Sequence, residues 1–457
     1  MKSFIPFLLM TLLVVGCSSP TSSTPAASAT TPTASTAKAL TAFSFAGLSP
    51  VVTGTVTEST HTVAVTVPYG TALTALVATF TTTGASVKVG TTSQVSATTA
   101  NNFTSPVTYT VTAADGSTQA YTVTVVVSAV SLSGIVTTLA GSVAGGSFNA
   151  TGTAASFSSP TGVATDGTNV YVADFTNNLI RKIVISTGAV TTLAGSVAGG
   201  STNATGTAAS FYRPYGVATD GTNVYVADTG NNMIRQIVIS TGVVTTLAGS
   251  VAGGSFNATG TAASFSSPTG VATDGTNVYV ADSSNNLIRK IVISTGVVTT
   301  LAGSLNSGST NATGTAASFD FPVGLATDGT KLFVADGTNN LIRQIVIGTG
   351  AVTTLAGSGT AGSLNATGTA ASFNGPTGVA TDGANLYVAD QGNKLLRKIV
   401  ISTGVVTTLA GSGTAGSLNA TGTAASFSRP YGVAMNANVP SQLFVADQTN
   451  NLIREIQ

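Results

Sequence analysis

A four-residue motif, Leu-Ala-Gly-Ser, returns at a fixed spacing through the second part of the chain. It begins at six positions, each 54 residues after the one before: Leu139, Leu193, Leu247, Leu301, Leu355 and Leu409. Short apolar segments separated by turn residues fill each period. A fixed period of this size with short strands inside it is typical of a β-propeller and not of a solenoid of helices.

Each period contains four segments with the composition of β-strands. In the first complete unit they are residues 161–165, 169–173, 179–185 and 189–194, and an Asp-Gly turn, a strong hairpin signal, separates the first two. The segments are nearly continuous runs of Val, Ile, Leu and Ala. Such runs are expected where neighbouring sheets cover both faces of a strand. The pattern therefore predicts one four-stranded blade per period.

The same units resemble a known repeat family. The run Pro-Thr-Gly-Val-Ala-Thr-Asp-Gly-Thr-Asn-Val-Tyr-Val-Ala-Asp, followed after two residues by Asn-Asn-Leu-Ile-Arg-Lys-Ile, resembles the NHL repeat. Copies with local substitutions begin at Pro160, Pro214, Pro268, Pro322, Pro376 and Pro430. The last copy departs most, with Met435-Asn436 in place of Thr-Asp. The resemblance covers residues 132–457 and implies a propeller that mediates interactions.

The strand count also predicts how the ring closes. The repeat region opens with a fourth strand that has no preceding partners, residues 134–140, and ends with a third strand, residues 452–456. Pairing these two segments completes the last blade and covers two sheet edges that would otherwise promote aggregation. We therefore predict an all-β chain whose residues 132–457 form a six-bladed β-propeller closed by its N-terminal strand.

A different β-rich segment, residues 41–129, precedes the repeats. Val63, Val65 and Val67 alternate with polar residues, and two further strand-like runs flank an Asp-Gly turn at residues 115–116. A small β-sandwich fits this pattern. The segment resembles the bacterial Ig-like modules of surface lipoproteins, and this resemblance implies a role in spacing or adhesion.

The N-terminus has the features of an export signal. Residues 1–16 carry a positive charge at Lys2 and a short apolar stretch, and they end at Cys17, the only cysteine. This boundary resembles the lipobox of bacterial lipoproteins, which implies a signal peptide at 1–16 and lipidation of Cys17. Residues 17–40 are rich in Ser, Thr, Ala and Pro and predict a flexible stalk. By resemblance to Gram-negative lipoproteins, Ser18 in place of an Asp after the cysteine implies a location at the outer membrane or cell surface.

Charge and composition limit the partners. Charged residues make up 7% of the chain and the net charge is +1, so we expect no nucleic-acid partner. Beyond the signal no apolar run approaches the roughly 18–20 residues of a membrane helix. We therefore expect membrane contact only through the lipid anchor, and a monomeric protein.

An Asp and an Arg recur seven residues apart in every unit, beginning with Asp174 and Arg181. One hypothesis is a ring of carboxylates that binds a metal. The other is structural, with the Asp accepting backbone hydrogen bonds in its turn and the Arg satisfying it or a neighbouring blade. Repetition in all six units favours the structural hypothesis, since a site usually breaks the symmetry of its scaffold.

The repeats offer little catalytic chemistry. They contain no His or Cys, and their only Glu is Glu455. Long bacterial NHL repeats commonly carry Asp-Gly where this chain has Asn149-Ala150, which weakens a calcium hypothesis for these loops. We predict no catalytic residues, no metal and no cofactor. The alternative is a lactonase- or lyase-like enzyme with a cation held by Asp and Asn.

Differences between the copies cluster around the recurring proline and in the turn after Val-Ala-Asp. Both segments are expected on the same face of a propeller, where ligands usually bind. The turn position carries Phe175, Thr229, Ser283, Gly337, Gln391 and Gln448. The predicted ligand-binding residues are Tyr212, Arg213, Tyr215, Asp320, Phe321, Asn374, Arg429 and Tyr431. Neutral drift after recent duplication is the alternative, and it predicts differences scattered over both faces.

The function predicted from the sequence is therefore a non-enzymatic binding or scaffolding protein of the cell envelope. It would recognise a protein or a glycan through the loop face of the propeller. A third possibility is a purely structural surface protein with no specific ligand.

Overall fold

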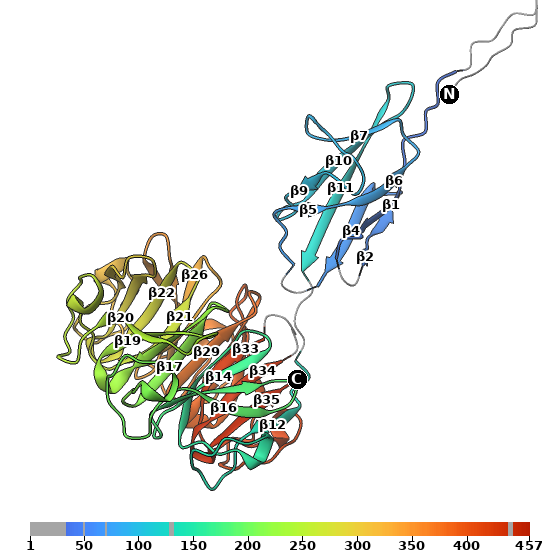
Figure 1. Cartoon of the computed structure of the whole chain (residues 1–457). Helices are drawn as coiled ribbons and strands as arrows, with labels where there is room; N and C mark the ends of the chain where they lie inside the picture. The colour runs from blue at the N-terminus through green and yellow to red at the C-terminus, as the bar shows by residue number, and fades with distance from the viewer. Residues whose placement is uncertain (1–32, 49–50, 69–70, 128–131, 437–441) are drawn as a thin grey trace, which may run out of the picture. The chain divides into compact units, whose positions relative to one another are not determined.

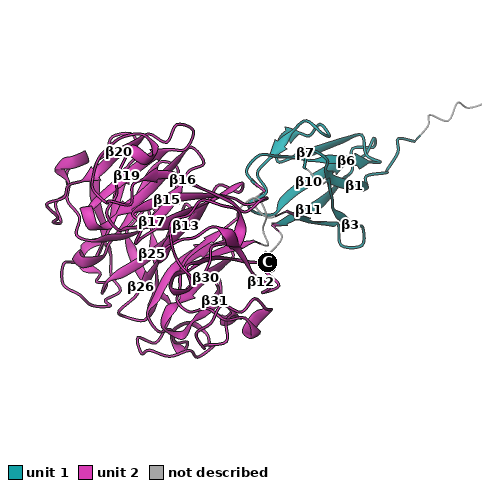
Figure 2. Ribbon diagram, turned by 60° about the horizontal axis from the view of Figure 1, so that its bottom comes forward, with its two compact units in different colours: residues 1–66, 72–126 teal, residues 67–71, 127–457 magenta. Residues whose placement is uncertain are grey.

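The computed structural model describes residues 33–48, 51–68, 71–127, 132–436 and 442–457. The chain divides into two compact units, one of residues 1–66 and 72–126 and the other of residues 67–71 and 127–457 (Figure 2). The signal peptide at 1–16 and the lipidation site Cys17 lie outside the described residues. No helix in the described ranges is long and apolar enough to cross a membrane.

The N-terminal unit consists of β-strands, most of them short (Figure 1). They are β1 (Leu40–Phe45), β2 (Val52–Thr53), β3 (Thr55–Thr57), β4 (Thr62–Val67), β5 (Leu76–Val77), β6 (Thr79–Thr82), β7 (Ser86–Val89), β8 (Thr92–Ser93), β9 (Ala100–Asn101), β10 (Val107–Thr112) and β11 (Thr118–Val127). One sheet has the order β2-β1-β6 and the other the order β3-β4-β11-β10-β7-β8, with β5 and β9 paired separately.

An aromatic core joins the two sheets of this unit. Phe43 of β1 meets Tyr109 of β10 edge to face, with ring centroids 5.4 Å apart, and Phe45 and Phe103 complete the cluster. The alternation predicted for β4 is observed, with Val63, Val65 and Val67 buried between exposed residues. The predicted hairpin is formed by β10 and β11. Both features follow from the two-residue period of a half-buried strand.

The second unit contains, within its described residues, six four-stranded antiparallel sheets, which we number blades 1 to 6 in chain order. Each blade has a first, second, third and fourth strand. The first strands are β13 (Pro160–Thr165), β17 (Pro214–Thr219), β21 (Pro268–Thr273), β25 (Pro322–Thr327), β29 (Pro376–Thr381) and β33 (Pro430–Met435). The second strands are β14 (Asn169–Asp174), β18 (Asn223–Asp228), β22 (Asn277–Asp282), β26 (Lys331–Asp336), β30 (Asn385–Asp390) and β34 (Leu443–Asp447).

The outer half of each blade follows the same scheme. The third strands are β15 (Leu179–Val184), β19 (Met233–Val238), β23 (Leu287–Val292), β27 (Leu341–Val346), β31 (Leu395–Val400) and β35 (Leu452–Ile456). The fourth strands are β16 (Ala189–Gly195), β20 (Val244–Gly249), β24 (Val298–Ala302), β28 (Ala351–Ala356), β32 (Val406–Ala410) and, in blade 6, β12 (Val136–Ala140). The predicted all-β class and propeller architecture are confirmed.

Short 3-10 turns punctuate the loops. Six of them lie in the loops that lead into the first strands: η1 (Gly152–Ala154), η2 (Gly206–Ala208), η4 (Gly260–Ala262), η6 (Gly314–Ala316), η7 (Gly368–Ala370) and η9 (Gly422–Ala424). The others lie between the second and third strands: η3 (Thr229–Asn231), η5 (Ser283–Asn285), η8 (Gln391–Asn393) and η10 (Gln448–Asn450).

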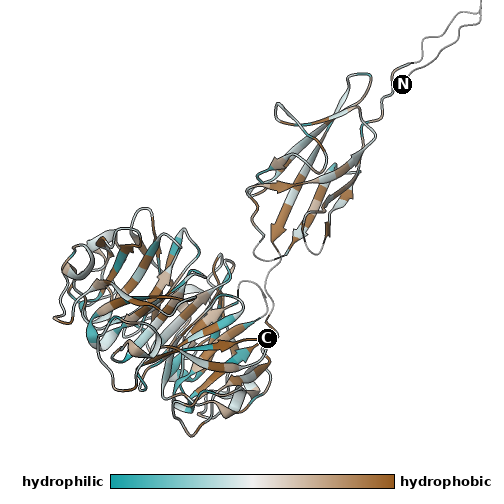
Figure 3. Ribbon diagram, in the orientation of Figure 1, coloured by the Kyte–Doolittle hydropathy of each residue, from teal (hydrophilic) through white to brown (hydrophobic). Residues whose placement is uncertain are grey.

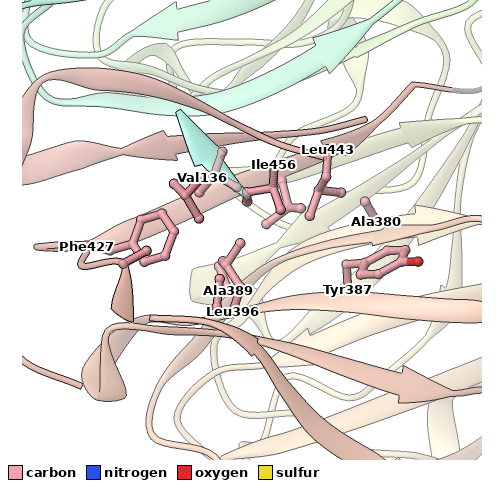
Figure 4. Close-up of a cluster of buried hydrophobic side chains, with 12 residues drawn as sticks. Val136, Ala380, Tyr387, Ala389, Leu396, Phe427, Leu443 and Ile456 are labelled. Carbon is pink, nitrogen blue, oxygen red and sulfur yellow. The ribbon is translucent and has the colours of Figure 1, made fainter. Parts of the chain in front are cut away.

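Blade 6 is assembled from both ends of the propeller region. Its sheet has the order β12-β35-β34-β33, and Val136 of β12 pairs with Ile456 of β35. Figure 4 shows these two side chains in one buried cluster with Phe427, and with Leu396 of blade 5. The apolar face of each blade is covered by the next in the same way, which is why hydrophobic residues run along the strands (Figure 3).

The six first strands meet around the axis at a ring of glycines. Each glycine lies against the backbone carbonyl of the residue that precedes the corresponding glycine of the next blade, and Gly432 of blade 6 lies against Thr161 of blade 1. The ring consists of Gly162, Gly216, Gly270, Gly324, Gly378 and Gly432. A Cβ at any of them would fall within 3.0 Å of that backbone, so no larger residue fits without moving a strand.

We expect Gly270→Ala to lower the free energy of unfolding by about 1–3 kcal/mol, because the added methyl group overpacks against the backbone at Val323. Gly348→Ala is the matched control, since a Cβ there meets no atom within 4 Å. Equilibrium denaturant unfolding of both variants measures the difference. Equal stabilities would contradict a tight glycine ring.

Candidate functional site

A buried ion pair holds the loop that enters each blade, and blade 2 illustrates it. Arg235 of β19 and Asp228 of β18 are fully buried, with 2.8 Å between Nη1 and Oδ2. The same Oδ2 accepts a hydrogen bond from the Asn231 side chain. Oδ1 accepts one from the backbone N–H of Tyr212, at 2.8 Å. One carboxylate therefore ties the second strand to the loop that leads into the first.

The arginine completes this attachment. Arg235 donates to the carbonyls of Ser210 and Thr202 and to Oδ1 of Asn203, at 2.7–3.1 Å, and lies 5.2 Å from the centroid of the Phe211 ring. The same pair recurs in all six blades with N–O distances of 2.7–3.1 Å: Asp174–Arg181, Asp228–Arg235, Asp282–Arg289, Asp336–Arg343, Asp390–Arg397 and Asp447–Arg454.

These contacts settle the role of the repeated Asp and Arg in favour of the structural hypothesis. Both oxygens of Asp228 face donors of the protein, and Asn203, at the position equivalent to Asn149, accepts from the arginine. Among the described residues no group of three or more His, Cys, Asp or Glu side chains is placed to hold a metal ion.

One mouth of the central channel is asymmetric. The residue before each ring glycine faces this mouth, and in ring order it is Thr161, Tyr215, Thr269, Val323, Thr377 and Tyr431. Tyr215 and Tyr431 meet edge to face with centroids 5.1 Å apart, and Phe175 contacts Tyr215 at 5.8 Å. The three rings belong to blades 1, 2 and 6. Tyr431 is buried and Phe175 and Tyr215 are half-buried, so the group presents only part of its ring surface to the mouth.

Two cavities open beside these rings. The larger, of about 730 Å³, is lined by Ser158, Ser159, Phe175, Arg429 and Gln448, among others, and we call it the Phe175 cavity. The smaller, of about 350 Å³, is lined by residues including Phe321, Asn374, Gln391, Arg429 and Tyr431, and we call it the Tyr431 cavity. Arg429 lines both, so it stands between them.

The opposite mouth is lined by small, mostly apolar side chains. A hollow of about 210 Å³ there is lined by the ends of the first strands, which present mostly Val, Ala and Thr, with Leu325 and Met435 as exceptions. Such side chains offer few hydrogen-bonding groups and no charge. Among the residues that line these three cavities, the repeats differ more at the first mouth than at the opposite one.

Arg429 and its neighbours give the first mouth its polar chemistry. With its amide oxygen facing the guanidinium, Gln391 accepts hydrogen bonds from Nη2 and Nε of Arg429 at 2.9 and 2.5 Å. The guanidinium lies 6.0 Å from the centroid of the Tyr431 ring. Burial raises the pKa of the Tyr215 phenol above its ordinary value, and the charge of Arg429 lowers it to a smaller extent. Tyr215 is therefore a neutral group at physiological pH.

The structure brings five of the eight predicted ligand-binding residues to this mouth. Phe321, Asn374, Arg429 and Tyr431 line the Tyr431 cavity, and Tyr215 belongs to the aromatic group. That these residues bind a ligand remains a prediction.

The other three predicted residues line neither of these two cavities and, unlike Tyr215, make no contact with the aromatic group. Arg213 stacks over Tyr212 at 5.4 Å, and Tyr212 is 43% exposed. Asp320 donates its backbone N–H to Asp336. Three further residues line the cavities although the sequence analysis names them only as variable turn residues: Phe175, Gln391 and Gln448. The signal for them was the same departure from the repeat.

The N-terminal unit and the propeller each match known proteins. Residues 40–125 match the family model described as SGBP, N-terminal. Human NHL repeat-containing protein 2 is 30% identical over 281 residues, which cover 53% of this chain and 39% of that protein. The resemblance to NHL repeats is confirmed. The chain spans between 26% and 39% of the length of the curated relatives it matches.

Solved structures with the same architecture come from Bacteroides thetaiotaomicron. A protein of unknown function matches with a TM-score of 0.57 and 19% identity, over 86% of this chain and 95% of that one. An auxiliary nutrient binding protein matches with a TM-score of 0.54 and 14% identity, over the same shares. These likenesses extend over both units and show the fold.

Removal of one buried carboxylate tests the ion pair. We expect Asp336→Ala to lower the free energy of unfolding by about 3–5 kcal/mol, because it leaves Arg343 charged and buried without its partner. The matched control is Asp320→Ala, which keeps the backbone N–H that reaches Asp336 and changes stability by less than about 0.5 kcal/mol. Urea unfolding compares them, and similar losses in both variants would contradict the assigned role.

Proposed function

We propose that this protein is a non-enzymatic glycan-binding protein of the cell envelope, and that the glycan binds at the aromatic mouth of the propeller. The observation that carries the proposal is the group formed by Phe175, Tyr215 and Tyr431 beside two cavities rich in amide and hydroxyl groups. Sugar rings pack their apolar faces on aromatic side chains while their hydroxyls bond to amides and guanidinium groups. Both kinds of group are present within one mouth.

The comparisons support a binding role. The N-terminal unit matches a family whose name denotes surface glycan-binding proteins, and one structural neighbour is called a nutrient binding protein. A nutrient polysaccharide at the cell surface is the ligand class that agrees with both names. In this proposal residues 41–129 form a module that spaces the propeller from the stalk at 17–40.

The geometry favours binding over catalysis. The repeated carboxylates are engaged in buried ion pairs, and the groups around the cavities are amides, hydroxyls, one guanidinium and aromatic rings. These groups bind sugars without forming or breaking bonds. The proposed site therefore needs neither a metal ion nor a nucleophile.

Two substitutions test the aromatic mouth without disturbing the scaffold. A panel of polysaccharides is first screened for one that the wild type binds. We expect Tyr215→Thr and Tyr431→Thr each to weaken binding of that polysaccharide by about tenfold or more, since aromatic anchors dominate such sites. Threonine already occupies this position in blades 1, 3 and 5, so the variants should keep the fold, and thermal unfolding measures the stability lost with each partly buried ring. Affinity electrophoresis and calorimetry measure binding.

The matched control for these variants is Tyr212→Thr, which changes an exposed tyrosine outside both cavities. Repeating the titrations in EDTA separates binding from a cation-dependent activity, and we expect no change. Wild-type affinity in both mouth variants would contradict the proposed site.

The same proposal places the protein on a lipid anchor at Cys17. We expect Cys17→Ser to move the protein from the membrane fraction to the soluble fraction of the envelope, because the acyl chains attach through this thiol. Fractionation with immunoblotting and labelling by a fatty-acid analogue provide the measurement. Ser18→Ala, which keeps the cysteine, is the control, and unchanged membrane retention of the Cys17 variant would contradict the anchor.

A further inference from the structure

Neighbouring blades are joined at the mouth by a recurring hydrogen bond. An Asn in the turn between the second and third strands accepts, through its side-chain oxygen, the backbone N–H of the residue before the next proline, at 2.8–3.0 Å. The pairs are Asn178–Arg213, Asn232–Ser267, Asn286–Phe321, Asn340–Gly375 and Asn451–Ser159. All five residues that donate have φ between 48° and 56°, in the left-handed region.

The junction between blades 5 and 6 breaks this rule. Lys394 occupies the turn position, with the same left-handed φ of 58°, but its side chain has no oxygen to accept a hydrogen bond. The N–H of Arg429 turns instead to Oδ1 of Asp447 in its own blade, at 3.2 Å. Arg429 is not among the residues with positive φ. Replacement of one Asn by Lys therefore coincides with a different backbone conformation at Arg429.

The side chain of Arg429 follows its backbone. Arg213 occupies the same repeat position in blade 2, keeps the hydrogen bond to Asn178, and stacks on Tyr212 away from both cavities. Arg429 lies between the two cavities and reaches Gln391. Two arginines at equivalent positions thus point to different surroundings, and they differ in the inter-blade hydrogen bond and in the preceding residue, Tyr212 in blade 2 and Ser428 in blade 6.

The charge of Arg429 is not balanced by a carboxylate. Every Arg–Asp ion pair found among the described residues belongs to the buried set that holds the loops. The groups next to the guanidinium are the neutral amide of Gln391 and the Tyr431 ring. An uncompensated guanidinium at a cavity is suited to a carboxylate or sulfate, which it can bind through two parallel hydrogen bonds.

We propose that Arg429, released from the inter-blade hydrogen bond by Lys394, recognises an acidic group, a carboxylate or a sulfate, on the bound glycan. The proposal rests on the proposed glycan-binding function and names the class of glycan. Arg429 is the residue that touches the ligand. Lys394 is a positioning residue that acts through the backbone of Arg429.

The first test uses the intact protein and matched polymers. Polygalacturonate is compared with its fully methyl-esterified form, and dextran sulfate with dextran, so that each pair differs in charge and the two acidic arms separate carboxylate from sulfate. We expect the wild type to bind at least one acidic polymer about tenfold more tightly than its neutral counterpart, with an affinity that falls as salt is raised. Arg429→Gln removes this preference, whereas Arg213→Gln keeps it.

The second test addresses Lys394. Lys394→Asn restores the amide present at the other five junctions, and we expect it to reduce acidic binding about as much as Arg429→Gln although Arg429 remains. Lys394→Met removes the same charge without supplying an acceptor and should retain most of the preference. In the double variant Lys394→Asn with Arg429→Gln, the losses should not add, because both changes remove one contact.

Each result has a defined meaning. Equal binding of charged and neutral polymers by the wild type, or an unchanged preference in Arg429→Gln, would overturn the acidic-group proposal while glycan binding stands. An effect of Lys394→Met as large as that of Lys394→Asn would overturn the positioning role. Failure to bind any of the four polymers in a wild-type protein of normal stability would count against glycan binding itself, and against this proposal with it.

Discussion

The buried Asp–Arg pair is the interaction on which the propeller and its mouth depend. In each blade the aspartate uses one oxygen for the arginine and the other for the backbone of the loop that leads to the mouth, as Asp228 does for Tyr212. A dry ion pair is a weak source of net stability, because desolvation offsets its attraction. The Nε of Arg235 has no hydrogen-bond partner within the described residues, which adds to that cost. The pair therefore acts chiefly by fixing one conformation of a loop that has little regular structure of its own.

Because the ion pairs fix the loop backbone, the loop side chains can differ, and near-identical repeats can therefore form an asymmetric mouth. The backbone of each mouth loop is held by groups common to all six blades, so the side chains before and after the proline are free to differ. Tyr215 and Tyr431 belong to blades 2 and 6, and they can meet because the residue between them in the ring, Thr161, is small. A large side chain at that position would fill the space in which the two rings touch.

The sequence predicted the scaffold better than the site, for a physical reason. Strand positions, the β12–β35 partners and the structural role of the Asp–Arg pairs follow from the repeat, because each is set by local pattern repeated six times. The direction of a loop side chain is not set by such a local pattern. Arg213 and Arg429 look equivalent in the sequence, yet the backbone of one is held by Asn178 and that of the other is not. In the sequence, Lys394 looks like an ordinary surface substitution. Its consequence is visible only once the structure shows the hydrogen bond that Asn accepts at the equivalent position of the other blades.

A symmetric ring cannot orient a ligand, because six equal sectors offer six equal poses. Two departures give this mouth a direction. The aromatic group over blades 6, 1 and 2 marks one side, and the guanidinium of Arg429 lies at its edge, between blades 5 and 1. A chain of sugars that stacks on the rings and carries an acidic group can satisfy both only in one orientation. In the proposed site, specificity would thus come from the positions where the repeats differ. The change at Lys394 would act indirectly, since it alters the scaffold hydrogen bond and not the contact with the ligand.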